Sequence, residues 1–353
     1  MSGNPTSEHT FPVSLASNRT GRSSVRIALL GDVMLGRGVA ARIGRREPTD
    51  FWGDLRPILL ASDLVVANLE CAITEHGSRW SRTPKRFHFR SPPAAVDVLL
   101  AGGIRAVSLA NNHVLDYEEE GLRETLASLE TAGIAHAGAG EDLTRAREPA
   151  IVDADDLRVA IVAFTDNAPG WAATRDRAGI SHLRFLPSPR PLDAVRSAVR
   201  RARAHGARFV ILSLHWGPNR VERPPWRFRA FARAALAVGV DLVHGHSAHR
   251  FQGIEIHRGR PILYDTGEAL DDYAVDPEMR NDRSFVFLAE IEGCRVRSLV
   301  LVPILIRSGV VGLGRGRDFE ETCERMRILS AELGTRVERE RDGLVVRLPA
   351  GNR

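Results

Sequence analysis

Short apolar runs recur along this chain, and several of them end in a residue that can bind a metal ion. Residues 25–30 have the pattern of a buried strand and lead to Asp32, and residues 63–69 lead in the same way to Glu70. Helical patterns, such as those at residues 51–61 and 117–132, separate most of these runs, and residues 251–264 predict a β-hairpin around Arg258-Gly259. Strands that alternate with helices fold into α/β layers, and their carboxyl ends form the usual ligand-binding edge. The sequence therefore predicts an α/β fold with polar residues along one sheet edge.

An Asn-Asn-His-x-x-Asp motif follows the predicted strand at residues 104–108. In this motif Asn112 offers an amide oxygen and His113 an imidazole. Asp116 comes three residues after His113, close enough in a helical turn to orient its ring. The alternative is that an Asn simply caps the following helix by accepting hydrogen bonds from free N–H groups. The motif alone leaves both interpretations open.

Three histidines within residues 244–249 favour a metal site most strongly. A single His is usually a structural hydrogen-bonding residue, but His246 and His249 are spaced to face one metal ion or a close pair. His215 ends a further apolar run. Carboxylate, amide and imidazole donors together suit divalent Mn, Fe or Zn. The candidate ligands are Asp32, Glu70, Asn112, His215, His246 and His249.

Basic and aromatic residues alternate over residues 85–90, which predicts a strand with one cationic face. Such a strand could be a solvated sheet edge, or it could hold the carboxylate or phosphate of a substrate. Lys85 in this run is the only lysine of the chain, so the other basic residues are arginines. The run is therefore either a surface feature or an anion-binding element.

Composition narrows the possible partners and the compartment. The 353 residues carry a formal net charge of only +5 and no basic run typical of nucleic-acid binding, so no nucleic-acid partner is expected. The three cysteines form no CxxC pair, which suits a reducing compartment. No apolar run approaches the roughly 18 residues of a membrane span. Residues 1–24 lack the apolar core of a signal peptide, so we expect a disordered leader and a cytoplasmic protein.

With these motifs in hand, the chain resembles the CapA family of poly-gamma-glutamate capsule synthesis proteins, which is related to calcineurin-like metallophosphoesterases. The similarity extends over residues 25–292, and its motifs occur in family order. The motifs are Gly31-Asp32 with Met34-Leu35-Gly36-Arg37, Asn68-Leu69-Glu70, Ala110-Asn111-Asn112-His113 with Asp116-Tyr117, Ser213-Leu214-His215-Trp216-Gly217, and Gly245-His246 with His249. The resemblance implies a metallophosphoesterase-like β-sandwich flanked by helices. Residues 293–353 would form a small C-terminal α/β extension packed on the main domain.

The resemblance also implies a site for two divalent metal ions, with the six candidate ligands above around it. Glu70 would be the bridging carboxylate, and His113, supported by Asp116, would protonate the leaving group. Met34 stands where metallophosphoesterases usually have His, so one of the two sites could be weak or empty. Ser247 likewise stands where many relatives have His. The residues expected to bind an anionic substrate are Arg37, Asn68, Lys85, Arg86 and Arg90.

Two functions fit this site. The first is a metal-dependent hydrolase or transferase that acts on poly-gamma-glutamate or on a related γ-glutamyl or phosphoester anion. The second is a non-catalytic, metal-containing subunit that binds or handles polyglutamate. The enzyme requires both the metal ligands and His113, whereas the binding subunit requires the ligands alone. The sequence does not distinguish an amide from a phosphoester as the scissile bond, and it leaves the oligomeric state open.

Overall fold

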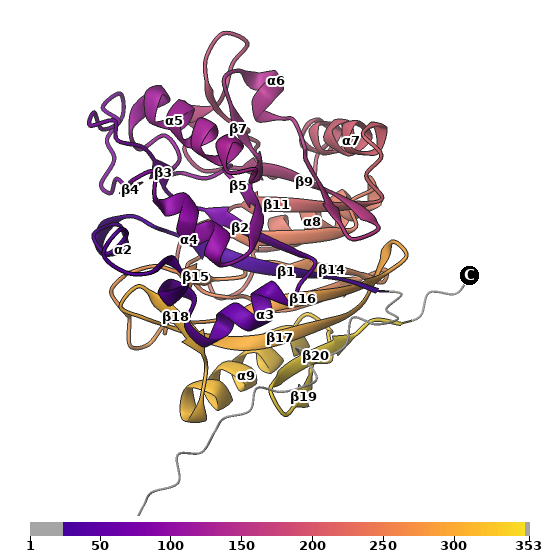
Figure 1. Cartoon of the computed structure of the whole chain (residues 1–353). Helices are drawn as coiled ribbons and strands as arrows, with labels where there is room; N and C mark the ends of the chain where they lie inside the picture. The colour runs from indigo at the N-terminus through magenta and orange to yellow at the C-terminus, as the bar shows by residue number, and fades with distance from the viewer. Residues whose placement is uncertain (1–23, 350–353) are drawn as a thin grey trace, which may run out of the picture.

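A computed structural model describes residues 24–349, which form two β-sheets packed face to face with helices on both outer sides (Figure 1). The larger sheet has, in spatial order, β19 (Glu338–Glu340), β20 (Gly343–Arg347), β17 (Arg295–Arg307), β16 (Arg283–Glu292), β1 (Ser24–Val33), β2 (Leu64–Leu69), β5 (Ile104–Ser108) and β6 (Ala135–Ala137), with β15 (Glu268–Leu270) beside β1 and β18 (Val310–Leu313) beside β17. The sandwich flanked by helices that the sequence predicts is confirmed.

The smaller sheet has six strands. In spatial order they are β13 (Ile254–His257), β14 (Arg260–Leu263), β12 (Leu242–His246), β11 (Phe209–His215), β9 (Leu157–Thr165) and β8 (Ala150–Ala154). Two short strand pairs are β3 (Ala72–Ile73) with β4 (Arg90–Ser91), and β7 (Ala139–Gly140) with β10 (Gly179–Ile180). The predicted β-hairpin around residues 258–259 is present as β13 and β14, which pair antiparallel.

The helices divide between the two outer faces. The larger sheet is covered by α3 (Arg56–Leu60), α4 (Ala95–Ala101) and α5 (Glu118–Thr131), and the smaller sheet by α7 (Pro189–Ala204) and α8 (Trp226–Ala237). The C-terminal helix is α9 (Gly316–Ala331). Short helical segments are α2 (Arg37–Ala40), η1 (Pro48–Leu55), α6 (Leu143–Ala146) and η2 (Pro169–Trp171). None of the helices within residues 24–349 combines the length and the apolar character needed to cross a membrane.

Strand β1 shows how the sequence makes these layers. Its side chains alternate between the two faces of the sheet, as in any strand. Ala28 and Leu30 belong to the core under the helices, whereas Ile27 and Leu29 belong to the core between the sheets. A third core lies between the smaller sheet and its own helices. Because both faces of the central strands are buried, these strands read as continuous apolar runs rather than as alternating patterns.

The C-terminal segment continues the larger sheet. Strand β17 pairs antiparallel with β16 along its length, and β20 pairs with β17. Cys323, Met326 and Leu329 of α9 pack into the core between the two sheets. Residues 295–347 thus share a sheet and a core with the preceding residues. Of the leader expected at residues 1–24, only Ser24 lies within the described residues, and it begins β1.

Two local expectations were wrong. The strand predicted at residues 85–90 is absent except for Arg90, which belongs to β4. The reason is that the Phe89 N–H donates to the Asp116 carboxylate at 2.6 Å instead of to a neighbouring strand. The single helix predicted at residues 51–61 is divided into η1 and α3, and Gly53 has a positive φ of 43° inside η1.

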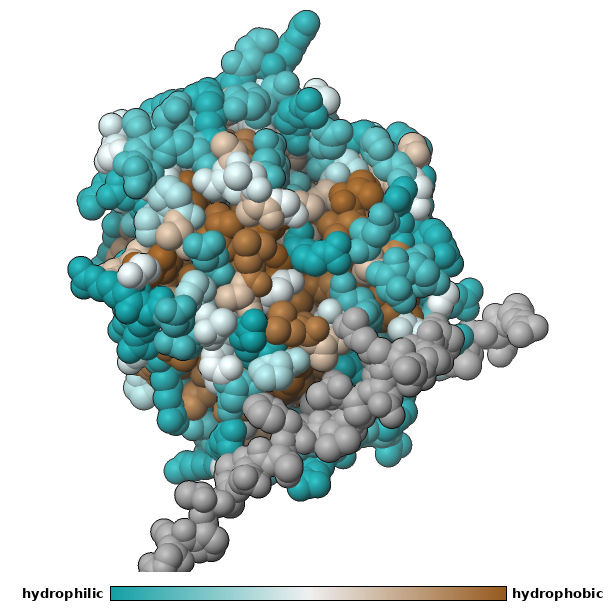
Figure 2. Space-filling model, viewed as in Figure 1, coloured by the Kyte–Doolittle hydropathy of each residue, from teal (hydrophilic) through white to brown (hydrophobic). Residues whose placement is uncertain are grey.

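One outer face of the molecule combines a hydrophilic margin with hydrophobic residues nearer its centre (Figure 2). Two of the exposed large apolar side chains are Leu60 of α3 and Leu100 of α4, each 45% exposed. Both helices otherwise bury their apolar residues in the core under the larger sheet, including Leu59 and Leu99. These leucines are therefore the outward-facing residues of helices whose other side packs on the sheet.

Candidate metal centre

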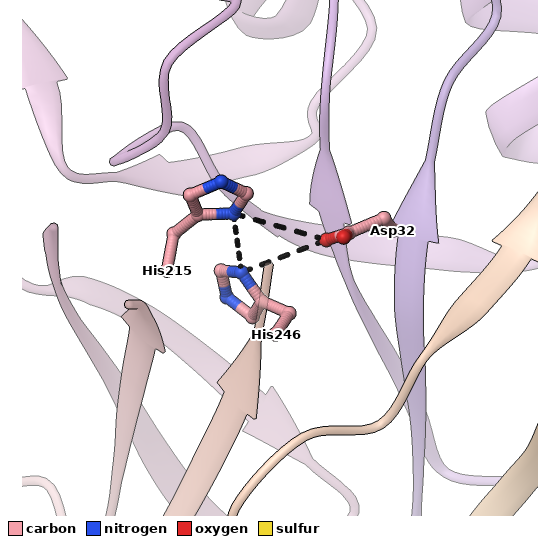
Figure 3. Close-up of side chains that lie close together, drawn as sticks. All are labelled: Asp32, His215 and His246. Carbon is pink, nitrogen blue, oxygen red and sulfur yellow. Dashed lines mark hydrogen bonds and ion pairs between the residues drawn. The ribbon is translucent and has the colours of Figure 1, made fainter. Parts of the chain in front are cut away.

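The carboxyl ends of parallel strands from both sheets meet at one place. Strands β1, β2 and β5 are parallel in the larger sheet, and β9, β11 and β12 are parallel in the smaller sheet. His215 and His246 are the last residues of β11 and β12 and lie opposite each other in register. Asp32 lies near the end of β1. These three buried side chains point toward one another across the two sheets (Figure 3).

Asp32, His215 and His246 form the first group that could hold a metal ion. The Nδ1 atoms of the two imidazoles are 3.0 Å apart. Oδ1 of Asp32 lies 3.6 Å from Nδ1 of His246 and 3.9 Å from Nδ1 of His215. Ser213 Oγ lies 2.8 Å from Nε2 of His246, on the far side of that ring. Such a contact fixes the ring so that Nδ1 faces the group.

Asp32 also belongs to a second group, together with Glu70, His249 and Glu268. Glu70 follows β2 directly, and Nδ1 of His249 contacts Oε1 of Glu268. His249 and the nearby Ser247 have positive φ angles of 56° and 113°, which non-glycine residues adopt rarely and often at functional sites. Asp32 is thus the residue that the two groups share, and the bridging role that the family resemblance implies for Glu70 stays a prediction.

Sequence reasoning missed Glu268 as a member of the centre. It begins β15, which pairs with β1 so that Glu268 lies opposite Asp32. The only sequence signal is a carboxylate at the end of the predicted hairpin, after Asp265, Thr266 and Gly267. The pairing of β15 with β1 joins residues 236 positions apart, which no local pattern indicates. Glu268 therefore adds a third carboxylate to the second group, beside Asp32 and Glu70.

Several buried oxygen atoms of the candidate ligands lack hydrogen-bond donors. Within residues 24–349, no donor reaches Oδ2 of Asp32, either carboxylate oxygen of Glu70, Oε2 of Glu268 or Oδ1 of Asn112. A buried polar atom without a partner costs free energy, and a buried carboxylate costs more. A cation bound among these oxygens would remove that cost. The donor set therefore fits a divalent metal ion.

The pKa shifts follow from burial. Burial raises the pKa of Asp32 to about 7 and the pKa values of Glu70 and Glu268 well above their usual range. Burial also lowers the pKa values of His215 and His246 well below theirs, so both rings are neutral at pH 7. Neutral imidazole is the form that binds metal ions, and a nearby cation would favour ionised carboxylates. The electrostatics thus suit a cation-binding site.

Two buried asparagines position the candidate ligand Asp32 through a chain of hydrogen bonds. Asn68 donates from Nδ2 to Oδ1 of Asp32 at 2.7 Å. Asn111 donates to the side-chain oxygen of Asn68 at 3.1 Å and to the carbonyl of Leu69 at 2.7 Å. Both side chains are fully buried. Asn68, expected to bind substrate, therefore contacts a candidate ligand, and Asn111 is a positioning residue that sequence reasoning did not single out.

His113 lies at the edge of the second group and is held by Asp116. Its Nδ1 is 2.7 Å from Oδ2 of Asp116, and its Nε2 is 3.9 Å from Oε1 of Glu70. The ring of Phe89 stacks on His113 with a centroid distance of 4.2 Å. Burial, together with the charge of Lys85, lowers the pKa of His113 well below its usual range. Burial raises the pKa of Asp116 to about 7.

The ammonium group of Lys85 points inward. Its Nζ donates to the carbonyl oxygen of Asn112 at 2.5 Å and lies 3.1 Å from Oδ1 of Asp116. It also lies 4.8 Å from the centre of the Trp171 ring. Lys85 thus connects the backbone of Asn112, a candidate ligand, with the carboxylate that holds His113.

The expected arginines occupy different places. Arg37 and Arg90 line an open cavity of about 630 Å³, together with Arg79, His88 and Tyr117. Arg37 lies 3.7 Å from Asp272, and Arg90 lies over the ring of Tyr117. Arg86 lies over the ring of Phe87, outside the residues that line this cavity. The structure therefore brings Arg37 and Arg90, but not Arg86, to one cationic hollow.

Comparison with known proteins identifies the family. The family described as "Bacterial capsule synthesis protein PGA_cap" matches residues 26–273. The chain belongs to the PGA_cap family. Its resemblance to CapA, read from the sequence motifs, is thereby confirmed. The PGA_cap match includes every member of both groups, from Asp32 to Glu268.

Named relatives support the same family. A Mycobacterium tuberculosis (strain ATCC 25618 / H37Rv) protein named "Probable polyglutamine synthesis accessory protein" is 32% identical over 377 residues, which cover 93% of this PGA_cap chain and 97% of the relative. The capsule biosynthesis protein CapA of Bacillus anthracis is 27% identical and is aligned over 70% of this chain and 59% of its own length. The PGA biosynthesis protein CapA of Bacillus subtilis (strain 168) is 28% identical, with shares of 69% and 63%.

A solved structure, TT1561 of Thermus thermophilus, aligns with 76% of this PGA_cap chain and 98% of its own. The TM-score is 0.39 and the sequence identity is 9%. A likeness this low carries no argument about the site, so the description of the metal centre depends on this chain's own side chains.

Proposed function

We propose that this PGA_cap protein is a metal-dependent hydrolase with two divalent ions, and that it acts on poly-gamma-glutamate or a related γ-glutamyl or phosphoester anion. The observation that carries this proposal is the pair of ligand groups that share Asp32 and leave several buried oxygens without donors among the described residues. Manganese, iron and zinc suit such a mixture of carboxylate and imidazole. Asp32, His215 and His246 would hold one ion, and Asp32, Glu70, His249 and Glu268 the other. Asn112 would add its side-chain oxygen.

Ions held at such a centre supply water activation and polarisation of the scissile group. The chain's own residues provide proton transfer and positioning. His113 is neutral because burial lowers its pKa, and its Nδ1–H can be donated to Asp116. Its Nε2 then faces Glu70 with a free lone pair, able to accept a proton and return it to a leaving group. We therefore assign His113 as the proton-transfer residue, with Asp116 and Lys85 holding its orientation.

The cationic cavity supports the proposal of an anionic substrate. Its lining includes the guanidinium groups of Arg37, Arg79 and Arg90, and Glu75 is the only carboxylate among the described residues that line it. Arg37 also lies over the ring of Tyr273, and this ring meets that of His249, a member of the second ligand group. Guanidinium groups bind carboxylates and phosphates through paired hydrogen bonds. A polyanion with one end at the metal centre would extend its next charged groups toward these arginines.

The second candidate is a non-catalytic subunit that binds metal and polyglutamate. The printed name of the M. tuberculosis relative, which contains the word "accessory", favours this possibility. Such a subunit needs the ligand groups and the cationic cavity for binding. It does not need His113 to transfer a proton. The role of His113 therefore distinguishes the two candidates.

The experiment compares the wild-type protein with His113→Asn. Both would be loaded with manganese or zinc, analysed for metal content and assayed on aryl phosphates and on γ-glutamyl amides. The hydrolase predicts that His113→Asn keeps its metal but loses about 10²- to 10⁴-fold in turnover. His136→Asn is the matched control, because His136 lies on β6 and pairs with Glu130 at the surface.

Other outcomes would contradict this assignment. A wild-type protein that binds metal and poly-gamma-glutamate but turns over neither class of substrate would favour the non-catalytic subunit. Loss of metal from His113→Asn would identify His113 as a ligand. A wild-type protein without bound metal after loading would remove the basis of the hydrolase.

A further inference from the structure

The hydroxyl group of Tyr273 is a buried polar atom without a hydrogen-bond partner among residues 24–349. The chain has three tyrosines, and Tyr264 provides a direct contrast within the same segment. The Tyr264 hydroxyl donates to Oε2 of Glu255 at 2.7 Å. Buried tyrosines usually pair their hydroxyl in this way, because a buried unpaired donor costs free energy. The unpaired hydroxyl of Tyr273 therefore requires an explanation.

The ring of Tyr273 lies between the metal centre and the cationic cavity. It meets the His249 ring edge-on at 5.4 Å and the Phe89 ring at 5.7 Å. Phe89 in turn stacks on His113. The guanidinium of Arg37, which lines the cavity, lies 5.9 Å from the centre of the Tyr273 ring. A phenol in this position contacts a candidate metal ligand on one side and a cavity arginine on the other.

The surroundings of Tyr273 contain acceptors that its hydroxyl does not use. Oδ2 of Asp271, Oδ1 of Asp272 and Oε2 of Glu268 are also buried and also lack donors among the described residues. The Tyr273 hydroxyl is therefore out of hydrogen-bonding reach of these neighbouring carboxylates. The backbone holds it there, because the Tyr273 N–H donates to Oδ1 of Asp271 at 2.6 Å. A donor kept apart from nearby acceptors is available to an acceptor that comes from outside the chain.

We propose that Tyr273 is a substrate-binding residue whose hydroxyl donates a hydrogen bond to an anionic oxygen of a substrate held at the metal centre. This inference rests on the proposed function, since the metal centre and the cavity define where that substrate lies. The oxygen belongs to a phosphoryl or a carboxylate group, which share this acceptor chemistry. A hydrogen bond to a charged acceptor contributes more than one between neutral groups, so its loss should weaken binding about 10- to 100-fold.

The test uses Tyr273→Phe with Tyr264→Phe as the matched control. Inorganic phosphate and glutarate serve as the two probes, titrated into the metal-loaded full-length proteins by calorimetry. We expect Tyr273→Phe to keep its metal content and to bind one of the probes about 10- to 100-fold more weakly. The probe that is affected distinguishes a phosphoryl from a carboxylate oxygen. Tyr264→Phe should bind both probes as the wild type does.

Thermal unfolding of the metal-free proteins gives a second readout that does not involve activity. Tyr273→Phe removes an unpaired buried hydroxyl, so its unfolding temperature should stay the same or rise. Tyr264→Phe removes the donor to Glu255, so its unfolding temperature should fall. A fall in Tyr273→Phe as large as that in Tyr264→Phe would show a structural role for Tyr273 and overturn the inference.

Metal analysis separates failure of this inference from failure of the proposed function. A wild-type protein that takes up no metal overturns both. Normal metal content with unchanged binding of both probes in Tyr273→Phe overturns the inference alone, as does the failure of both probes to bind the metal-loaded wild type. Loss of metal from Tyr273→Phe would make Tyr273 a ligand and would also overturn it.

Discussion

Two clusters of acidic residues in this protein, one partly exposed and one buried, differ in the hydrogen-bond donors that reach them. At the joint between α9 and β16, Asp318 accepts hydrogen bonds from Arg280 at 2.9 Å and from Arg283 at 2.6 and 3.0 Å. At the metal centre, Glu70 accepts none from any described residue, and Asp32 accepts at only one oxygen, from Asn68. The chain is rich in arginine, so cations were available to both clusters. The difference supports the proposal that the centre takes a cation from outside the chain.

The pKa shifts of the two clusters have opposite signs. Burial raises the pKa of Asp32 from the ordinary value of 3.8 to about 7. Against the effect of burial, the hydrogen bonds from Arg280 and Arg283 lower the pKa of Asp318 below 3.8. In the folded, metal-free protein the ionised form is therefore disfavoured at Asp32 and favoured at Asp318. Three predictions follow this contrast, from the largest expected effect to the smallest.

Chelation should destabilise the protein more than any single substitution. An ion that binds only the folded protein stabilises it by about 2.7 kcal/mol at a free concentration one hundred times its dissociation constant, so two ions would contribute roughly 5 kcal/mol. We expect the free energy of unfolding, measured by urea denaturation with zinc or manganese and then with excess chelator, to fall by that order. An unchanged urea midpoint would mean that the centre tolerates its unpaired carboxylates without a cation.

Substitution should separate the clusters by metal content. Asp32→Ala removes the residue shared by both ligand groups, so metal affinity should fall about 100-fold or more. This loss exceeds the loss in affinity that is usual when a residue that only hydrogen-bonds to a ligand is removed. Asp318→Asn is the control. It should keep the metal content of the wild type and lose about 1–2 kcal/mol of stability, because its hydrogen bonds from arginine become weaker. Metal-binding titrations and urea denaturation measure both effects, and equal metal content in the two variants would contradict the contrast.

The pH dependence of the metal-free protein is the smallest effect when it is measured per pH unit. The pKa of Asp32 is higher in the folded than in the unfolded protein. Its contribution to the free energy of unfolding is therefore fully present below about pH 3.8 and is lost as the pH rises through about 7. Stability should therefore fall between about pH 4 and about pH 7, by at most about 1.4 kcal/mol per pH unit for one proton, and level off above that. Asp32→Asn should flatten this slope. Asp318→Asn should leave this slope unchanged. The contribution of Asp318 to the free energy of unfolding is present above pH 3.8 and is lost only as the pH falls through its lowered pKa in the folded protein.

The sequence predicts the layers and part of the centre because the relevant signals are local. His215 and His246 directly continue apolar runs, so their place at the ends of β11 and β12 can be read from neighbouring residues. The sandwich flanked by helices and the family resemblance are both confirmed. The metal-binding and catalytic roles of the individual residues stay predictions.

The rest depends on contacts between distant segments. Glu268 enters the centre only because β15 pairs with β1, which the sequence does not indicate. The prediction of a strand at residues 85–90 is wrong because Lys85 and the Phe89 N–H both contact Asp116. Asp116 belongs to a distant part of the sequence, the segment between β5 and α5. Alternation of basic and aromatic residues is the same in an exposed strand and in a segment folded over a buried carboxylate. Only the packing distinguishes the two.

The single lysine gives this protein a built-in chemical label. Amine-reactive reagents can modify only the N-terminal amino group and Lys85, whose side chain is 15% exposed and lies against Asp116. Mass spectrometry of a peptide that contains Lys85 can therefore follow acylation of one side chain separately from the N-terminal amine, because the rest of the surface carries guanidinium groups instead. The rate of that reaction would report how often the segment around Lys85 opens to solvent. A ligand that closes the neighbouring site would slow the labelling.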